Sequence, residues 1–119
     1  MNGALMIRWG QSIPGREAAS LEVFSSVINW FESLAKGGRI HSHHEYFSVT
    51  GRFGGFAILE GELGELTKIL AEEDTQRIND KAGAVVQDYE IQTYFGGSDQ
   101  TIQTAIANYT TSLQDLGFM

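Results

Sequence analysis

The spacing of the apolar residues switches several times between an alternating and a helical pattern. The order of these patterns along the chain is the sequence feature that most constrains the fold. Apolar positions alternate over 5–10, follow a helical period from Arg16, and alternate again over 40–50 and 56–60. A second helical stretch covers 62–71, and a last extended stretch covers 84–95. The breaks between these stretches are made by glycine, because the chain has 14 Gly and one Pro. The pattern predicts the order strand, helix, strand, strand, helix, strand.

The first predicted helix has an unusually wide apolar face. Its main stripe includes Phe24 and Phe31, and the helix stops at Gly37-Gly38. Val23, Trp30 and Leu34 widen the stripe to about half of the circumference, since consecutive residues turn by about 100°. A helix that covers only its own sheet needs a narrower apolar face. We therefore expect the extra flank to meet a second surface, either another subunit or the C-terminal helix.

The second half of the chain contains three further helical or extended segments. Residues 51–55 predict a hairpin connection, and 72–81 predicts a short helix that ends near Gly83. The stretch 84–95 is expected to be the last and longest strand. A helix capped by Ser98 or Asp99 follows. It has a narrow apolar stripe at Ile102, Ala105, Ile106, Tyr109, Leu113 and Leu116.

Together these segments predict an α+β fold of the ferredoxin-like βαββαβ type, with an additional C-terminal helix. The length of 119 residues fits one domain, with a core over about 5–97 and the last helix over about 98–117. In this fold, an antiparallel sheet is covered by helices on one face. The other face must meet solvent, a ligand or a partner, and its large residues favour a partner.

Composition excludes several classes of function. The net charge of −7 argues against a nucleic-acid partner or an anionic membrane surface. The absence of cysteine excludes disulfides, thiolate metal sites and cysteine nucleophiles. No apolar run approaches the roughly 20 residues of a membrane span, and no signal-peptide pattern opens the sequence. We expect a cytoplasmic protein.

Two segments carry a family resemblance. The turn and helix start at Trp9–Glu17, and the Ala82–Val86 segment, resemble small uncharacterised bacterial proteins of the dimeric α+β barrel superfamily. The resemblance covers about residues 5–97. It implies a homodimer in which two ferredoxin-like sheets pack face to face. The superfamily includes small monooxygenases, haem-degrading enzymes and YCII-like proteins with a His-Asp pair, but none of their catalytic patterns can be placed here residue by residue.

All three histidines lie within four positions, at His41, His43 and His44. On a strand, His41, His43 and Glu45 share one face, because side chains alternate. Two imidazoles and a carboxylate in this spacing can bind a borderline divalent metal. No further histidine exists to complete such a site, so we expect ordinary surface histidines here, and neither a metal nor a cofactor.

The same alternation predicts a polar set on the face away from the helices. This set comprises Arg8, His44, Tyr46, Glu90, Gln92 and Tyr94. Polar groups with aromatic walls suit a small-ligand pocket, in which Arg8 pairs with a carboxylate and His44 or Glu90 exchanges protons. The alternative is an Arg8–Glu90 ion pair within a dimer interface, with the tyrosines packed across it.

Three functions therefore remain open from the sequence. The first is a homodimeric protein with a small-molecule pocket between its sheet and its partner. The second is a monooxygenase-like or YCII-like enzyme, so enzymatic activity stays undecided. The third is an interaction module without a pocket. A cofactor-free monooxygenase should have a deep apolar cavity with one His or Trp at its wall, whereas a plain interface should have none.

Overall fold

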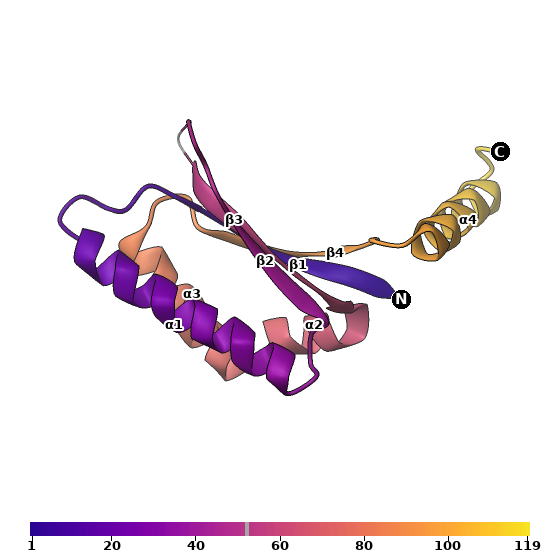
Figure 1. Cartoon of the computed structure of the whole chain (residues 1–119). Helices are drawn as coiled ribbons and strands as arrows, with labels where there is room; N and C mark the ends of the chain where they lie inside the picture. The colour runs from indigo at the N-terminus through magenta and orange to yellow at the C-terminus, as the bar shows by residue number, and fades with distance from the viewer. Residues whose placement is uncertain (52) are drawn as a thin grey trace.

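The computed structural model of the chain describes residues 1–51 and 53–119 (Figure 1). The predicted connection over 51–55 therefore includes one position, Arg52, that lies outside the described residues. The elements are β1 (Asn2–Gly10), α1 (Glu17–Lys36), β2 (Ser42–Phe47), β3 (Phe53–Glu62), α2 (Leu63–Leu70), α3 (Glu73–Val85), β4 (Glu90–Phe95) and α4 (Asp99–Asp115).

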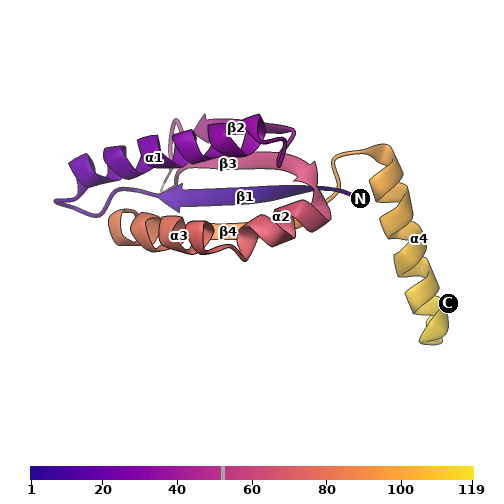
Figure 2. The ribbon, with the colours of Figure 1, turned by 90° about the horizontal axis from the view of Figure 1, so that it is seen from below.

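The four strands form one antiparallel sheet in the order β2-β3-β1-β4. Helices α1, α2 and α3 cover one face of this sheet, as Figures 1 and 2 show from two directions. In residues 1–51 and 53–119, no helix covers the opposite face; we call it the bare face. The α+β class and the ferredoxin-like arrangement predicted from the sequence are both confirmed.

The core lies between the sheet and the three covering helices. Leu5 and Ile7 of β1 and Leu59 of β3 point into it, because alternate residues of a strand face the same side. Phe31 of α1 and Leu66 of α2 meet them from the helix layer. All five side chains are buried. Among the described residues, no helix is long and apolar enough to cross a membrane.

The prediction of a long last strand over 84–95 was wrong. Helix α3 continues to Val85, and β4 contains only the six residues Glu90–Phe95. The helix persists because Ala82 and Val85 are buried on its inner side, so tertiary packing outweighs the local preference of the segment. Asp88, with a φ of 53°, then turns the chain into β4.

The hairpin between β2 and β3 also differs from the prediction. The extended stretch predicted over 40–50 is shorter, because strand β2 ends at Phe47 and Val49 beyond it is 97% exposed. Gly54 and Gly55, expected in the connection, lie in β3. Glycine is suitable there because the indole of Trp9 lies close to this part of the β3 backbone.

The wide flank of α1 packs within its own chain. Leu34 joins the buried core cluster, Trp30 packs against that cluster, and α1 lies beside α3. The second surface that we expected to be another subunit or the C-terminal helix is therefore largely α3. Helix α4 instead projects away from the sheet and the other helices (Figures 1 and 2).

Candidate functional site

A largely apolar cavity of about 350 Å³ lies between α1, α3 and the end of the sheet. Ile7 and Trp9 of β1 form its sheet side, Phe24 and Val27 of α1 form its helix side, and Val85 closes it from α3. Leu21 and Phe47 also line it and are more than 60% exposed, so they stand at its mouth. A cavity of this size can hold a molecule of two or three fused rings.

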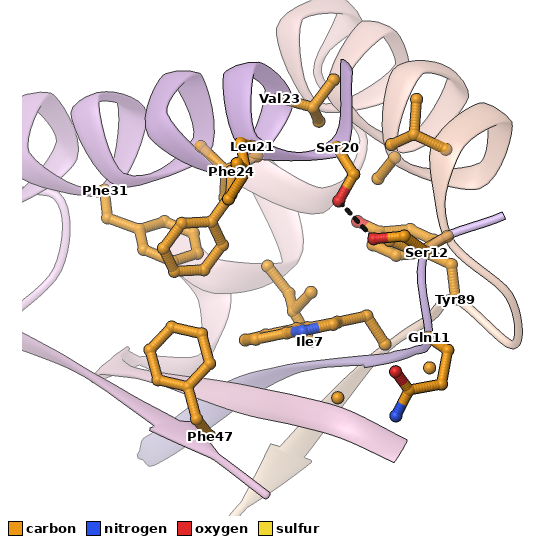
Figure 3. A pocket seen from close by; sticks show the side chains of 17 residues that line it. Ile7, Gln11, Ser12, Ser20, Leu21, Val23, Phe24, Phe31, Phe47 and Tyr89 are labelled. Atoms are coloured by element: carbon orange, nitrogen blue, oxygen red, sulfur yellow. Dashed lines mark hydrogen bonds between the residues drawn. The ribbon is translucent and has the colours of Figure 1, made fainter. Parts of the chain in front are cut away.

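Aromatic rings occupy one side of the cavity. The ring centroids of Trp9 and Phe24 are 5.8 Å apart, those of Phe24 and Phe47 are 5.3 Å apart, and those of Trp9 and Phe47 are 6.2 Å apart. Figure 3 shows Phe24, Phe31 and Phe47 gathered on this side. The rings are mutually tilted or edge-on, a geometry in which their quadrupoles attract.

The other side of the cavity contains a few polar groups. The hydroxyls of Ser12 and Ser20 are 2.8 Å apart (Figure 3), and Gln11 also lines the cavity. The turn after β1 is fixed to the end of α3, because the Ile13 N–H donates to the Val85 carbonyl at 2.9 Å. These side chains can therefore donate to or accept from one polar end of a bound molecule.

Tyr89 is the ionisable residue among those that line this cavity in the described part of the chain. Its hydroxyl donates to Oδ1 of Asn79 at 2.7 Å, and burial raises its pKa to about 12. It therefore stays neutral near pH 7. Among the described residues, the lining offers neither a carboxylate nor an imidazole as a general acid or base.

The position of Trp9 depends on the glycines of β3. A Cβ added to Gly54 would lie 2.8 Å from Cδ1 and 2.9 Å from Nε1 of the Trp9 indole. A Cβ added to Gly55 would lie 2.9 Å from Cζ2 of the same ring. Two consecutive glycines thus allow the indole to lie directly on the strand backbone, where it forms the floor of the cavity.

The six residues predicted for the polar set all lie on the bare face. Arg8 of β1 lies opposite Glu90 of β4 on one side and opposite Phe56 of β3 on the other. Phe56 in turn lies opposite Tyr46 of β2. Register partners share a face, and so do alternate residues of one strand. His44 lies two residues before Tyr46, and Gln92 and Tyr94 lie two and four residues after Glu90, so all three are on the same face.

The bare face divides the predicted set into two groups. Arg8, Glu90, Gln92 and Tyr94, together with Met6, line a shallow hollow of about 300 Å³. His44 and Tyr46 lie on β2 and do not line this hollow; the ring of Tyr46 stacks on Phe56 at a centroid distance of 5.0 Å.

Arg8 and Glu90 form the ion pair that the second alternative drawn from the sequence includes. Nη2 of Arg8 donates to Oε2 of Glu90 at 2.6 Å, so the guanidinium is already bound to a carboxylate of its own chain. A ligand carboxylate would have to compete with this ion pair.

The three histidines do not form the arrangement of His41, His43 and Glu45 that the sequence allowed as a metal site. Nδ1 of His43 lies 2.7 Å from Glu45, and Nε2 lies 2.8 Å from Glu32 of α1. His41 precedes β2 and is exposed. Within the described residues, no group of three or more His, Asp or Glu side chains could hold a metal ion.

Sequence reasoning placed a pocket on the bare face and missed the cavity on the helix side. The available signal was the wide apolar face of α1, where Val23 and Phe24 both line the cavity. That face was attributed to another subunit or to the C-terminal helix. The Trp9–Glu17 segment, which carries part of the family resemblance, contributes to the floor of the same cavity through Trp9 and to its polar end through Gln11 and Ser12.

Solved structures of similar fold support the ferredoxin-like assignment. A dimeric protein of unknown function and ferredoxin-like fold from Bacteroides fragilis is 9% identical and superposes with a TM-score of 0.60, covering 80% of this chain and 96% of its own. A conserved protein from Methanosarcina mazei has the same TM-score at 15% identity, covering 80% of this chain and 93% of its own. Neither family models nor curated proteins match the sequence.

Two further structural neighbours carry enzymatic names. A protein from Deinococcus radiodurans, described as a candidate antibiotic biosynthesis monooxygenase, is 15% identical with a TM-score of 0.60, covering 82% of this chain and 94% of its own. SnoaB, a cofactor-independent oxygenase from Streptomyces nogalater, is 13% identical with a TM-score of 0.58, with the same two coverages. These likenesses establish the fold. They leave about a fifth of this chain without an equivalent.

Proposed function

We propose that this protein binds a small, largely apolar aromatic molecule in the cavity between α1, α3 and the sheet. The observation that carries this proposal is the cavity itself, which has aromatic rings on one side and a Ser12–Ser20 hydroxyl pair on the other. Fused rings match the aromatic side by stacking and edge contacts, and one hydroxyl or carbonyl of the ligand matches the polar end.

The two tryptophans allow a direct test by NMR. The chain has two indole N–H groups, and Trp9 lines the cavity whereas Trp30 does not. We expect titration with 1-naphthol, a two-ring probe, to shift the Trp9 indole signal in a saturable manner and to leave the Trp30 signal in place. The variant Trp30→Phe assigns the two signals.

Two outcomes of this titration contradict the proposal. If neither indole signal moves up to the solubility limit of the probe, the cavity does not bind two-ring compounds. If both signals shift together without saturation, the probe binds non-specifically to apolar surface. Cyclohexanol, which has a similar polar group but no aromatic ring, is the matched control ligand and should bind more weakly.

A second candidate function is cofactor-independent oxygenation of the bound molecule. Trp9 at the wall of an apolar cavity favours it, as do the two neighbours named as oxygenases. Without a cofactor, the substrate must supply the electrons: a ring CH₂ group and O₂ then give a C=O group and water. Because the cavity lining lacks a carboxylate or imidazole base, such a substrate must lose its proton readily by itself.

Oxygen uptake separates the two functions. If a phenolic tricyclic probe with an acidic ring CH₂ group binds the cavity and causes protein-dependent O₂ consumption above the rate in buffer, with conversion of its CH₂ group to C=O, the protein is an oxygenase. If the probe binds and O₂ consumption stays at the buffer rate, the oxygenase candidate fails for this compound class, and binding alone stands.

We also propose that the protein works as a homodimer joined through the bare faces of two sheets. The bare face carries Tyr46 and Tyr94, which are about half exposed, beside Met6, Phe56 and Ile58. A neighbour of the same fold is described as dimeric. The hollow at Arg8, Glu90, Gln92 and Tyr94 would then be enclosed between the sheet and its partner, as a second, more polar ligand pocket.

A further inference from the structure

Helix α4 presents an apolar stripe that is largely exposed. Ile102 is 44% exposed, Ile106 54%, Tyr109 67% and Leu116 70%. The radius of gyration is 16.9 Å, against about 13.5 Å for a compact chain of this length. The excess comes from α4, which Figures 1 and 2 show projecting beyond the end of the sheet.

The direction of α4 is fixed at its first turn. The Ser98 hydroxyl accepts from the Thr101 N–H at 3.2 Å and caps the helix. Thr101 is buried, and its Oγ1 accepts from the Asn2 N–H at 3.3 Å. The Gly96 N–H donates to the Asn2 carbonyl at 3.0 Å. These contacts tie the base of α4 to the start of β1, so the stripe beyond the first turn is held away from its own sheet.

Helix α4 needs a packing partner. A helix of 17 residues is marginally stable in water by itself, and proteins stabilise helices mainly by burying their apolar faces. Its sequence has no Lys or Arg, and its two acidic residues lie at its ends, Asp99 and Asp115. The stripe therefore suits an apolar protein surface and not an anionic membrane.

The position of α4 relative to the bare face indicates which protein surface could cover its apolar stripe. Figure 1 shows α4 on the side of the sheet opposite to α1, α2 and α3, which is the side where a second sheet would pack. The four strands have nine, six, ten and six residues, so the sheet offers roughly 500 Å² of projected area. This is below the ~800 Å² that each partner buries in a standard interface. A second contact region would bring the buried area closer to that value.

We propose that α4 is a clasp that packs its apolar stripe, centred on Ile106 and Tyr109, on the partner subunit of the homodimer. This inference rests on the proposed bare-face dimer and extends it. Two-fold symmetry makes the contact reciprocal: each chain gives one stripe and receives one, so the assembly closes at two copies. The same contact would bury the apolar residues that follow the helix, Phe118 and Met119, both above 70% exposed in one chain.

Photo-crosslinking from α4 tests the clasp. The chain has no cysteine, so a single Tyr109→Cys substitution can be labelled with a benzophenone, which keeps an aromatic group in the stripe. We expect irradiation to give a covalent dimer of twice 13.1 kDa. Thr111→Cys, on the opposite side of α4, is the matched control and should give at least about fivefold less.

A charge substitution provides the second measurement. In sedimentation equilibrium, Ile106→Glu should raise the dimer dissociation constant at least about tenfold, about 1.4 kcal/mol, whereas Thr111→Glu should leave it unchanged. Circular dichroism checks that both variants keep their helix content.

The outcomes of these experiments distinguish the clasp from the bare-face dimer and from ligand binding in the cavity. A dimer without crosslinks from position 109 to the partner overturns the clasp and leaves the bare-face dimer standing. Equal crosslinking from 109 and 111 overturns the assignment of the stripe. A monomeric wild-type chain overturns both the clasp and the dimer, and the titration of the Trp9 indole still decides ligand binding independently.

Discussion

The Nε2 atom of His43 lies 2.8 Å from the carboxylate of Glu32, and this contact joins β2 to α1. The other ring nitrogen, Nδ1, lies 2.7 Å from Glu45 on the same strand. Both ring nitrogens can donate only when the imidazole is protonated. Burial lowers the pKa of His43, but the hydrogen bonds to Glu45 and Glu32 outweigh burial, so the pKa lies above its ordinary value of 6.5.

The raised pKa of His43 predicts a pH-dependent stability. A raised pKa in the folded state means that the stabilisation is fully present below the ordinary value of 6.5 and is lost as pH rises through the folded pKa. We therefore expect the free energy of unfolding, measured with urea, to fall as the pH rises above 6.5 and through the raised pKa of His43. His43→Gln should reduce this fall. His41→Gln, a substitution of an exposed histidine nearby, should retain it.

The contacts of Arg39 predict that the stability of the fold depends on pH in the acid range. Its Nη1 and Nη2 atoms donate to the two carboxylate oxygens of Glu72 at 2.7 and 2.9 Å, and its Nε donates to Glu65 at 2.7 Å. These bonds raise the pKa of Arg39 further and lower the pKa of Glu72 below 4.5. The stabilisation is thus present above pH 4.5 and lost as pH falls through the folded pKa of Glu72.

The variant Arg39→Lys tests this three-way contact. An ammonium group cannot make two parallel bonds to Glu72 and a third to Glu65, so the midpoint of acid unfolding should move to higher pH. Arg77→Lys is the control, because Arg77 pairs with Glu73 and Asp74 on the exposed surface of α3. Equal shifts in both variants would show that the Arg39 geometry is unimportant.

The sequence was sufficient to predict the order of the strands and the two faces of the sheet, although not the bounds of β2 and β4. The alternation of Leu5 and Ile7 with Met6 and Arg8 correctly separated the two faces of β1. The end of α3 was predicted wrongly because Ala82 and Val85 suit either a helix or a strand, and their burial beside α1 decides the matter.

The cavity could not be predicted because it depends on contacts between distant segments. Trp9, Phe24 and Phe47 come from β1, α1 and β2, and their mutual distances follow from how α1 crosses the sheet. Period and spacing specify which face each residue occupies but not whether facing side chains fill the space between them. A void of this kind is a property of tertiary packing.

Filling the cavity should abolish ligand binding without unfolding the protein. Val27 lines the cavity from α1 and is half-buried, so Val27→Phe adds a ring where there is now space. We expect the dissociation constant for 1-naphthol to rise at least about tenfold while the free energy of unfolding changes by less than about 1 kcal/mol. Val49→Phe, at an exposed position outside the cavity, should change neither quantity. Unaltered binding in Val27→Phe would place the ligand elsewhere.

Truncation of the core should destabilise the chain strongly. Leu59 lies in the central strand β3 with no exposed surface, so Leu59→Ala leaves a void and should lower the free energy of unfolding by about 2–5 kcal/mol. Leu21→Ala removes the same atoms from a side chain that is 70% exposed and should cost less than about 1 kcal/mol. Chemical denaturation compares the two variants; similar losses would contradict the burial described for β3.

Two glycine-to-alanine substitutions should act in opposite directions. A Cβ at Gly55 would meet the Tyr46 carbonyl oxygen too closely and would lie 2.9 Å from Cζ2 of Trp9, so Gly55→Ala must displace β2 or the indole. A Cβ at Gly83 in α3 meets no atom within 4 Å, so Gly83→Ala should stabilise the helix by up to about 1 kcal/mol.

Both substitutions restrict the unfolded chain in the same way, so the difference between them reports the folded state. We expect Gly55→Ala to lower the free energy of unfolding by more than about 1 kcal/mol and to shift the Trp9 indole signal even without ligand. It should also weaken 1-naphthol binding, because the floor of the cavity moves. If Gly55→Ala leaves the indole signal and the affinity unchanged, Trp9 does not lie on the β3 backbone as described, and the cavity loses its floor.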